Sequence, residues 1–566
     1  MHLILPSRPR IWGLFKGYSR MDFGRDLRAA VNVTIMAFPL SVAFAIASGA
    51  TPEQGLFSAI IGGALIALFS GSPVQIGGPT GAFVVITYGT LHQYGPDGLL
   101  LCTALAGLML VGMALGRLGQ VIRFIPFPVN RAFTNGIACL ILGSQLKSFL
   151  GLRGGDLPTE LPAKIIWVIG HPAAIHAPTV ALAVGSLLVV LFWPERLARW
   201  VPGPMAGLVL AATVVAGFGL AERWQVATIA TQFGGISREL PGLHVPHFDW
   251  AKLPELVHPA FTIALLVAMQ ALLCCVVTDG MLDQRHDSNQ ELLAQGLANL
   301  AGPFFGCLPV TGGVARSIAN VRCGGRTPVA GLLHSLLLLL LLVLAAPLLG
   351  RLPLASLSAI LVLSAARMLD PRQFVRLSRW PFSDAAVFLA TFALTVLANL
   401  TLAVEVGVVL AALLLVKRLA ETSQITAVDE RNETEHSEDS VLGKDVPPGV
   451  VIFHVFGALF FGVVDKLDQE LKRTKPPPRV LILRVRKVLA MDATGLQAVE
   501  DLLAKLRAKG QHLLLCGLHT QPLVVMQRSG FLDRLGMDNV CGDIDDALKR
   551  ARELLAPPPP GTGPGR

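Results

Sequence analysis

Long apolar runs alternate with short polar segments along most of the chain, from Leu27 to Leu419. A membrane-spanning helix needs about 20 largely apolar residues, and the pattern predicts fourteen such passes, some of them short or broken. They are expected at residues 27–48, 52–70, 76–92, 98–115, 129–149, 173–193, 203–220, 256–277, 289–304, 309–320, 327–349, 353–367, 382–399 and 402–419. The first run follows a basic segment and continues into a full span, so no cleavable signal peptide is predicted.

The pattern changes after Glu421. Residues 430–445 are polar and acidic, as in a linker, and from Val450 onward apolar strands alternate with amphipathic helices, which predicts an α/β domain. Strands are expected at 451–461, 480–485 and 512–517, and helices at 464–473 and 494–509. The predicted organisation is a cytoplasmic N-terminal segment (1–21), a transmembrane domain (22–421), a linker (422–447), a cytoplasmic α/β domain (448–555) and a disordered tail (556–566).

The composition agrees with a membrane protein, since 53% of the 566 residues are apolar and only 15% are charged. This argues against a soluble enzyme and against a disordered chain.

The net charge of +9 lies entirely before Thr422, where 28 Lys and Arg stand against 19 Asp and Glu. With both termini inside, 20 of the positive residues fall in inner segments and 7 in outer ones, as expected for a multi-pass protein of the inner (plasma) membrane. This distribution places most of the excess positive charge on the cytoplasmic side of the membrane domain, where it faces anionic lipid. Nucleic acid is therefore not expected as a partner.

No cofactor or metal is predicted. The eight cysteines show neither a disulfide framework nor zinc-ligand spacing. Nothing in the chain supplies a nucleophile–base pair, a P-loop or an ATP site, so neither an enzyme nor a primary active transporter is expected.

Two short segments share a pattern of Pro, Thr and Gly where a helix should be continuous, at residues 69–82 and 305–313. They occupy the third and tenth passes, the same position in two seven-pass halves, which indicates an inverted repeat. Two half-helices starting near the membrane centre would aim free N–H groups and positive dipole ends at one point. Arg316, which the topology count leaves inside a span, would add a full positive charge there. The pattern therefore favours an anion site. The alternative is that the breaks serve only helix packing and that Arg316 snorkels to the cytoplasmic face.

Several motifs resemble the sulfate permease (SulP) family of anion transporters, in its bacterial form. They are Pro39-Leu-Ser-Val-Ala-Phe-Ala-Ile-Ala-Ser-Gly, Thr80-Gly81, His286-Asp-Ser-Asn-Gln-Glu-Leu, Pro309-Val-Thr-Gly-Gly with Arg316, and Asn320-Val-Arg-Cys-Gly-Gly-Arg-Thr-Pro328. The tail resembles the STAS domain of that family. The resemblance implies seven plus seven inverted passes as in uracil permease, with passes 1–4 and 8–11 forming a core and passes 5–7 and 12–14 a gate. It also implies elevator-like movement of the core and a homodimer.

The resemblance places the substrate between helices 1, 3, 8 and 10. The implied site comprises Phe38, Pro39, Leu40 and Ser41, where Pro39 is expected to break helix 1, then Thr80, Gly81 and Ala82, Gln270, and Gly313, Val314, Ala315 and Arg316. The residue before the arginine is often a hydroxyl residue in animal members, so Ala315 leaves backbone N–H groups as the ligands at that position.

The residues of helix 8 indicate which ion drives transport. Sodium-coupled relatives place an Asp and a Thr where this chain has Gln270 and Cys274, and neither of these is a good ligand for Na⁺. We therefore expect proton coupling or exchange rather than sodium symport. Candidate proton carriers are Glu53, Asp279, Asp283 and Glu405, with a structural ion pair favoured for Glu405. The row Asp279, Asp283, Asp287 and Glu291 is interpreted as a solvated inner helix end with a cap at Asp287 or Ser288.

In the tail, Met491-Asp-Ala-Thr-Gly-Leu496 matches the STAS loop in which related proteins are phosphorylated. Thr494 is the matching residue, but a helix cap by Asp492 or Thr494 with a tight turn at Gly495 explains the same sequence.

The favoured function is secondary active transport of a small anion such as sulfate, bicarbonate or a dicarboxylate like fumarate. A passive anion channel, a nucleobase permease of the same fold and a membrane-anchored regulator that works through the STAS domain are the alternatives.

Overall fold

The structure is a computed structural model that describes residues 8–122, 127–153, 158, 160–198, 201–238, 242–243, 252–398, 400–422, 424–427, 441, 444–459, 463–474 and 476–556. The chain divides into two units, Met1–Ala411 and Ala412–Arg566. The predicted disordered tail and most of the predicted linker lie outside the described residues.

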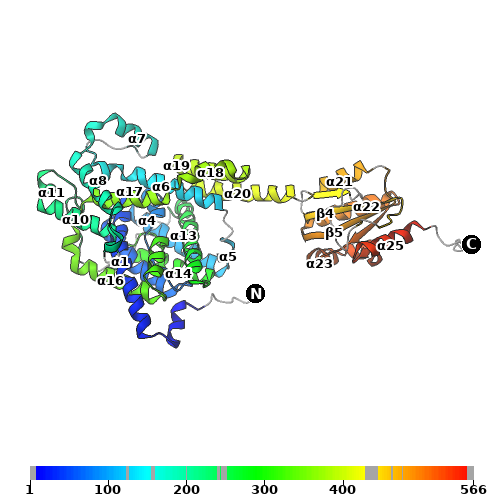
Figure 1. Cartoon of the computed structure of the whole chain (residues 1–566), viewed down its shortest axis with the longest axis horizontal. Helices are drawn as coiled ribbons and strands as arrows, with labels where there is room; N and C mark the ends of the chain where they lie inside the picture. The colour runs from blue at the N-terminus through cyan, green and yellow to red at the C-terminus, as the bar shows by residue number, and fades with distance from the viewer. Residues whose placement is uncertain are drawn as a thin grey trace, which may run out of the picture. The chain divides into compact units, whose positions relative to one another are not determined.

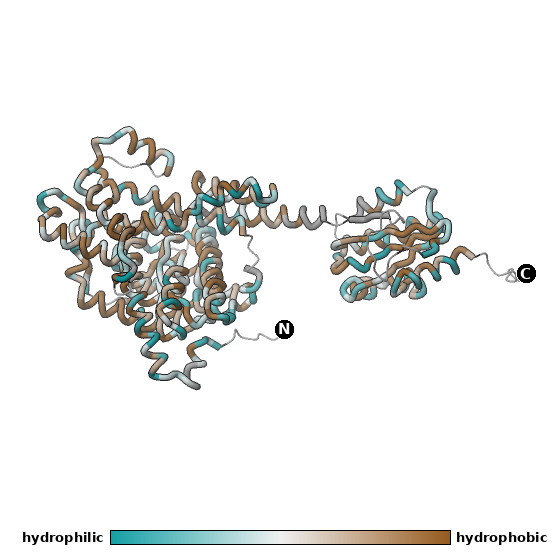
Figure 2. Tube along the Cα trace, viewed as in Figure 1, coloured by the Kyte–Doolittle hydropathy of each residue, from teal (hydrophilic) through white to brown (hydrophobic). Residues whose placement is uncertain are grey.

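The first unit consists of helices that coincide with the predicted apolar segments (Figure 1). Its longer helices are α1 (Arg20–Ala47), α4 (Val84–Leu115), α6 (Phe127–Leu150), α8 (Ala177–Leu191), α10 (Gly203–Gly217), α13 (Leu253–Leu282), α14 (Ser288–Ala301), α16 (Val329–Leu349), α17 (Leu354–Met368), α19 (Phe382–Leu397) and α20 (Leu400–Thr422), which runs on into the second unit. Apolar residues dominate these helices (Figure 2). Among the described residues, six helical segments are long and apolar enough to cross a membrane, and several shorter apolar helices accompany them.

Shorter elements connect the long helices. The second predicted pass is built from α2 (Pro52–Phe57), the π-helical turn η2 (Ser58–Gly62) and α3 (Gly63–Phe69), and the tenth from β2 (Thr311–Gly312) and α15 (Val314–Arg322). The others are η1 (Arg10–Lys16), β1 (Gly77–Gly78), η3 (Gly81–Phe83), α5 (Gly119–Ile122), α7 (Leu161–Gly170), η4 (Pro172–Ala174), α9 (Glu195–Ala198), α11 (Leu220–Arg223), α12 (Ile229–Phe233), η6 (Gly302–Phe305), α18 (Pro371–Arg376) and η7 (Leu377–Arg379).

Proline has different effects in two helices. The expected break of the first helix at Pro39 is wrong, because α1 continues through this residue to Ala47. Pro39 cannot donate to the carbonyl one turn earlier, but α1 is packed against α2, α15, α16 and α17, which hold it in place. The third and fourth predicted passes are instead separated inside α4, where Gly95, at φ +75°, precedes Pro96. Only glycine adopts that backbone conformation without strain, so the chain turns there.

The second unit contains a five-stranded sheet in the order β3-β4-β5-β6-β7. Its strands are β3 (Gln424–Ala427), β4 (Val450–Leu459), β5 (Val480–Met491), β6 (His512–Cys516) and β7 (Val540–Cys541). Strands β4 to β7 pair in parallel and β3 pairs antiparallel with β4. Helices α21 (Val463–Arg473), α22 (Ala493–Ala508), α23 (Thr520–Arg528), α24 (Phe531–Leu535) and α25 (Ile544–Leu555), with the turn η8 (Met537–Asn539), accompany the strands (Figure 1). The apolar strands form the core of this unit (Figure 2).

The α/β prediction for the tail agrees with this sheet, but one boundary differs. Residues 424–427 fall within the expected linker and instead form β3. A four-residue strand whose partner lies more than 20 residues later gives no local signal, since its stabilising hydrogen bonds come from β4.

The loop before α22 is closed by Asp492, whose Oδ1 accepts the N–H of Gly495 at 2.7 Å. Of the two predicted capping residues, Asp492 is therefore the cap, and the Thr494 side chain is exposed. Gly495 is buried, and a Cβ at this position would overlap the main-chain oxygen of Leu459.

We expect Gly495→Ala to destabilise the second unit by about 2 kcal/mol, because the overlapping atom is backbone and cannot move aside. Calorimetric unfolding of the full-length protein measures this change. Gly542→Ala is the matched control, since a Cβ there has only one neighbour, at 4.0 Å. Equal unfolding temperatures for the two variants would contradict the prediction.

Candidate functional site

The two broken segments of the repeat meet in a short antiparallel ladder. Gly77 pairs with Gly312 and Gly78 with Thr311, and the N–H of Gly313 donates to the oxygen of Ile76 at 2.8 Å. We call this junction of β1 and β2 the crossing. Because main-chain hydrogen bonds join it, the start of the following helix in each repeat is fixed relative to the other. The broken segments of the third and tenth predicted passes are therefore in direct contact.

Side chains of α15 hold the chain that leads into β1. The N–H of Ile76 donates to Ser317 Oγ at 2.9 Å, and Asn320 Nδ2 donates to the oxygen of Val74 at 3.0 Å. These bonds satisfy main-chain groups that have no helical or sheet partner inside the unit. The second broken segment therefore provides the polar support for the first.

Two helices begin at the crossing without a side-chain cap. Thr80 is the extended residue before η3, which continues into α4, and Gly313 is the extended residue before α15. The first N–H groups of a helix have no partner within the helix, so those of Gly81, Ala82, Val314 and Ala315 are available to a ligand. Gly81 and Ala82 are buried, whereas Val314 is half-buried and Ala315 is exposed.

Arg316 lies in the first turn of α15 and is only 4% exposed. Its Nη2 donates to the oxygen of Pro79 at 2.6 Å, and its Nη1 lies 3.5 Å from the oxygen of Gly77. Among the described residues no carboxylate pairs with it. The guanidinium therefore reaches across to the first broken segment, and the alternative in which Arg316 snorkels to the membrane surface is wrong. A guanidinium carries five N–H donors, so several remain for an anion.

Glycine is required on both sides of this side chain. A Cβ at Gly78 would contact Arg316 Nη1, and one at Gly313 would lie 2.5 Å from Nε. Gly78 also has φ +143°, a backbone conformation that other residues rarely adopt.

We expect Gly78→Ala to lower the initial rate of anion uptake by about tenfold or more, because the added methyl group displaces the guanidinium and strains the main chain. Uptake into proteoliposomes measures the rate. Gly89→Ala, in α4 with open space around the added Cβ, is the control and should keep the wild-type rate. A Gly78→Ala rate equal to the control would show that the position of Arg316 does not matter.

Residues of α1 and α13 surround the crossing, since α15 packs against both helices and β2 packs against α13. Ser41 in α1 is fully buried, and neither its Oγ nor that of Thr80 has a partner in the described part of the chain. Phe38 belongs to the same buried apolar cluster as Ala82, while Leu40 is half-buried. The structure thus gathers elements that carry the predicted site residues, including two hydroxyl groups without a partner in the described ranges.

Gln270 lies in α13 and is half-buried. One turn earlier, the oxygen of Val267 accepts Thr311 Oγ1 of β2 at 3.2 Å, which ties this part of α13 to the crossing. Cys274, one turn further on, is fully buried.

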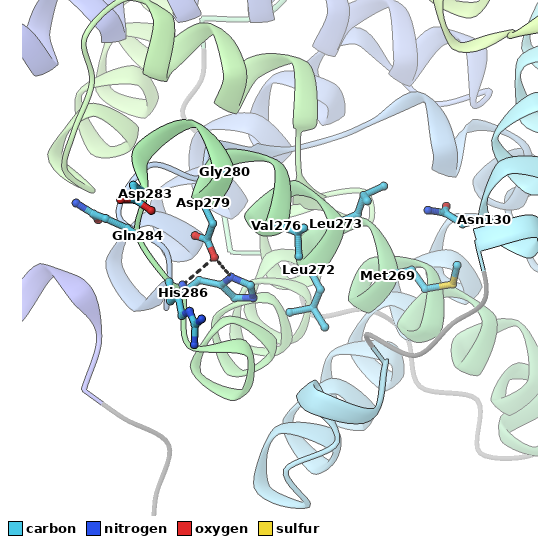
Figure 3. Close-up of a pocket in the computed structure, with 11 residues that line it drawn as sticks. Asn130, Met269, Leu272, Leu273, Val276, Asp279, Gly280, Asp283, Gln284 and His286 are labelled. Atoms are coloured by element: carbon cyan, nitrogen blue, oxygen red, sulfur yellow. Dashed lines mark hydrogen bonds and ion pairs between the residues drawn. The ribbon is translucent and has the colours of Figure 1, made fainter. Parts of the chain in front are cut away.

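A pocket of about 820 Å³ extends along α13 from Met269 to Asp283 and on to His286, with Asn130 of α6 at one end (Figure 3). Met269 is next to Gln270 in the sequence, so one end of the pocket reaches the level of the crossing. At the other end Asp279 accepts the main-chain N–H of His286 at 3.1 Å and lies 2.6 Å from its Nδ1 (Figure 3).

The four predicted coupling acids lie apart from one another, except that Asp279 and Asp283 both line this pocket. Asp283 is an exposed residue that ends α13 in a left-handed conformation. Glu53 Oε1 accepts the N–H of Ser237 at 2.8 Å, and Glu405 lies 3.3 Å from His258 Nδ1. In the contacts of the described residues none of the four reaches the crossing.

Glu291, one of the four acids predicted to lie at a solvated helix end, is fully buried. The carboxylate of Glu291 accepts Ser70 Oγ at 2.5 Å, the N–H groups of Gly71 and Ser72 at 3.1 and 3.3 Å, and Gln295 Nε2 at 2.7 Å. It therefore holds the turn that precedes β1. The predicted cap at Asp287 agrees with the structure, since Asp287 accepts two N–H groups at the start of α14.

Asn299 acts in the same way on the other broken segment. Its amide donates to the oxygen of Val310 at 2.8 Å and accepts the N–H of Val310 at 2.9 Å. Glu291, Gln295 and Asn299 recur at four-residue spacing, so they share one face of α14. We call them the α14 polar row. This four-residue spacing was the available signal for a polar face on α14.

Asp26 is a further buried acid that sequence reasoning did not identify. It is fully buried and accepts Thr327 Oγ1 at 2.5 Å, the N–H of Arg326 at 3.0 Å and the hydroxyl of Tyr18 at 3.0 Å. Burial and the Asp26 carboxylate raise the pKa of Tyr18. Asp26 joins α1 to the segment between α15 and α16.

Comparisons with known proteins give a consistent identification. Residues 23–391 match the family model described as the sulfate permease family, and residues 443–547 match the STAS domain. The chain is 37% identical over 528 residues to "Putative sulfate transporter YvdB" of Bacillus subtilis, covering 93% of this chain and 97% of the relative. It is 27% identical over 546 residues to "Bicarbonate transporter BicA" of Picosynechococcus, covering 93% and 94%.

Solved structures agree on the fold. The solved structure of SLC26A9 matches with a TM-score of 0.86 at 19% identity, over 96% of this chain and 92% of that one. The transmembrane domain of a cyanobacterial BicA matches with a TM-score of 0.60 at 27% identity, over 69% and 97%. The described helices, the crossing and the family matches lead to one conclusion: the chain belongs to the sulfate permease family, as a membrane transporter with a C-terminal STAS domain and not an enzyme.

Proposed function

We propose that the protein is a secondary active transporter that binds a small anion at the crossing, between the helix starts after Thr80 and Gly313. The observation that carries this proposal is Arg316, a buried cation without a carboxylate partner among the described residues. A charged group inside a membrane protein is costly unless it is paired. An anion at this position would pair with the guanidinium and with the free N–H groups of both helices.

The proposed ligands extend the pattern predicted from sequence. Arg316 supplies charge, and the N–H groups of Gly81, Ala82, Val314 and Ala315 supply fixed donors. The hydroxyls of Ser41 and Thr80, which have no partner among the described residues, would supply two more. All of these are donors or can act as donors, as an anion requires. Neither Phe38 nor Pro39 offers a polar side chain, so their part would be to shape the cavity.

The substrate class is a small oxyanion such as sulfate, bicarbonate or a dicarboxylate like fumarate. The names of two relatives, a putative sulfate transporter and a bicarbonate transporter, support the first two. A nucleobase would need a hydrogen-bonding carboxylate, and Gln270 stands at the position where nucleobase carriers of this fold have a Glu.

We further propose elevator-like movement of a core (passes 1–4 and 8–11) against a gate (passes 5–7 and 12–14), in a homodimer of the inner membrane with both termini cytoplasmic. The pocket along α13, with α6 at its end, would then be the inner route to the crossing. In this scheme transport is driven by proton coupling or anion exchange, with Asp279 and Asp283 on that route.

The STAS domain would regulate transport, and the exposed Thr494 is the proposed phosphorylation site.

A panel of uptake assays in proteoliposomes tests this function. Labelled sulfate, bicarbonate, fumarate, chloride and oxalate are offered with an imposed proton gradient, a sodium gradient or an internal anion. We expect saturable uptake of at least one oxyanion that depends on the proton gradient or on internal anion. Non-saturable flux that follows only the membrane potential would contradict a carrier and indicate a channel.

A further inference from the structure

A second cavity lies between α8, α10 and the short helix α11, away from the crossing. It has a volume of about 450 Å³ and its lining is almost entirely apolar, with Pro178, Leu182 and Val189 on α8 and Leu210 and Val214 on α10. Figure 1 places α8, α10 and α11 at the edge of the first unit. Leu210 and Val214 are 47% and 41% exposed. The cavity is therefore an open groove on a surface that faces apolar surroundings in a membrane protein.

At one end of the groove α8 and α10 approach each other closely, at Gly207. A Cβ at Gly207 would lie 2.8 Å from Val190 Cγ2 and 3.3 Å from the oxygen of Ser186, so α8 and α10 are in close contact there. Gly185 of α8 also lines the groove, and a Cβ there would meet nothing within 4 Å. The groove therefore has free space at Gly185, and its lining extends from Gly207 to Pro178 and Trp224.

Its length matches one leaflet of a bilayer. The lining on α8 runs from Pro178 to Val189, and the eleven steps between these two residues advance about 16 Å along a helix. Half of a hydrocarbon core of about 30 Å is about 15 Å. A helix of that length, about 10 Å across, would occupy roughly 1,200 Å³, which is more than twice the volume of the groove. The dimensions favour an extended acyl chain over a helix from another protein.

The wide end of the groove carries aromatic and basic groups. Trp224 lines it and is 55% exposed. Arg153 lies beside it, since its Nη2 donates to the oxygens of Trp224 and Gln225 at 3.1 and 3.3 Å. Arg153 is exposed and has no carboxylate partner among the described residues, although Glu222 is exposed in the same region. Trp and Arg at the end of an apolar surface are typical of the level of lipid headgroups.

We propose that this groove binds one acyl chain of an anionic phospholipid, with the phosphate of the headgroup at Arg153. The apolar lining accepts the chain, the contact at Gly207 sets its depth, and the guanidinium selects the charged headgroup. Because the groove lies along the junction of two packed helices of the proposed gate, a bound acyl chain would contact α8 and α10 together and stabilise their packing.

Native mass spectrometry of the full-length protein in detergent, titrated with phosphatidylglycerol or phosphatidylcholine, tests the proposal. Wild-type protein should retain one tightly bound phosphatidylglycerol per chain. Gly185→Leu fills the groove and should weaken that binding at least tenfold. Gly112→Leu in α4 is the matched control, because Gly112 is also exposed and a Cβ there also meets nothing within 4 Å. Arg153→Gln should abolish the preference for phosphatidylglycerol over phosphatidylcholine.

Two results would overturn the proposal. One is an unchanged phosphatidylglycerol affinity in Gly185→Leu, or in Ala181→Leu if the first variant does not give folded protein. The other is a fall in the dimer population of these variants without loss of bound lipid, which would assign the groove to contact between two copies of the chain.

Discussion

Arg316→Ala should lower the initial rate of anion uptake at low substrate concentration by about 100-fold, which corresponds to about 2.7 kcal/mol of lost binding energy. The reason is that Arg316 is the buried cation of the crossing, held by the oxygens of Pro79 and Gly77. Charge-assisted hydrogen bonds of this type contribute about 1.5–3 kcal/mol each. Proteoliposome uptake of the labelled anion measures the rate.

Two variants separate the role of the charge from that of the fold. Arg322→Ala changes an exposed arginine in the last turn of the same helix and should keep the wild-type rate. Arg316→Lys keeps the charge but loses the forked donor geometry, so it should recover only part of the rate. Wild-type affinity and rate in Arg316→Ala would remove the proposed site.

Glu291→Ala should destabilise the first unit by about 3 kcal/mol or more. The substitution leaves buried donors of Ser70, Gly71 and Gln295 without their shared acceptor, and each unsatisfied buried group costs about 1–3 kcal/mol. The N–H of Ser72 keeps Ser70 Oγ as its acceptor. Because these groups form the turn before β1, the crossing should lose its geometry as well. Thermal unfolding in detergent and the uptake rate measure the two effects.

The control for this prediction is Glu255→Ala, which removes an exposed carboxylate of α13 and should change the unfolding temperature little. Glu291→Gln keeps the shape but places an amide NH₂ among donors, so its stability should lie between those of Glu291→Ala and the wild type. If Glu291→Ala unfolds at the wild-type temperature, the α14 polar row does not support the crossing.

The helices of this protein were largely predictable because a bilayer imposes a simple rule. A span must be apolar and about 20 residues long, so α1, α6 and α13 appear directly in the hydropathy pattern. The crossing was predictable for a related reason, since Gly, Pro and Thr interrupt two apolar runs at equivalent positions. Local composition thus located the crossing, and the structure supplied its contacts.

The features that sequence could not supply depend on partners far along the chain. Pro39 predicts a break, but packing from several helices keeps α1 continuous. Glu291 stands in the first turn of α14, where an acidic residue is usually exposed to solvent. The hydrogen-bond donors that show it to be buried come from residues 70–72, about 220 positions away in the chain. Strand β3 is defined by pairing with β4. The four-residue spacing of Glu291, Gln295 and Asn299 indicates a polar face on α14, but the partners of these long-range hydrogen bonds cannot be read from the segment itself.

The most direct test of the central claim is a difference map between structures determined with and without the anion that the uptake panel selects. We predict one peak between the helix starts after Thr80 and Gly313, within hydrogen-bond distance of the Arg316 guanidinium. Density for the anion at another position, with none at the crossing under saturating conditions, would contradict the account.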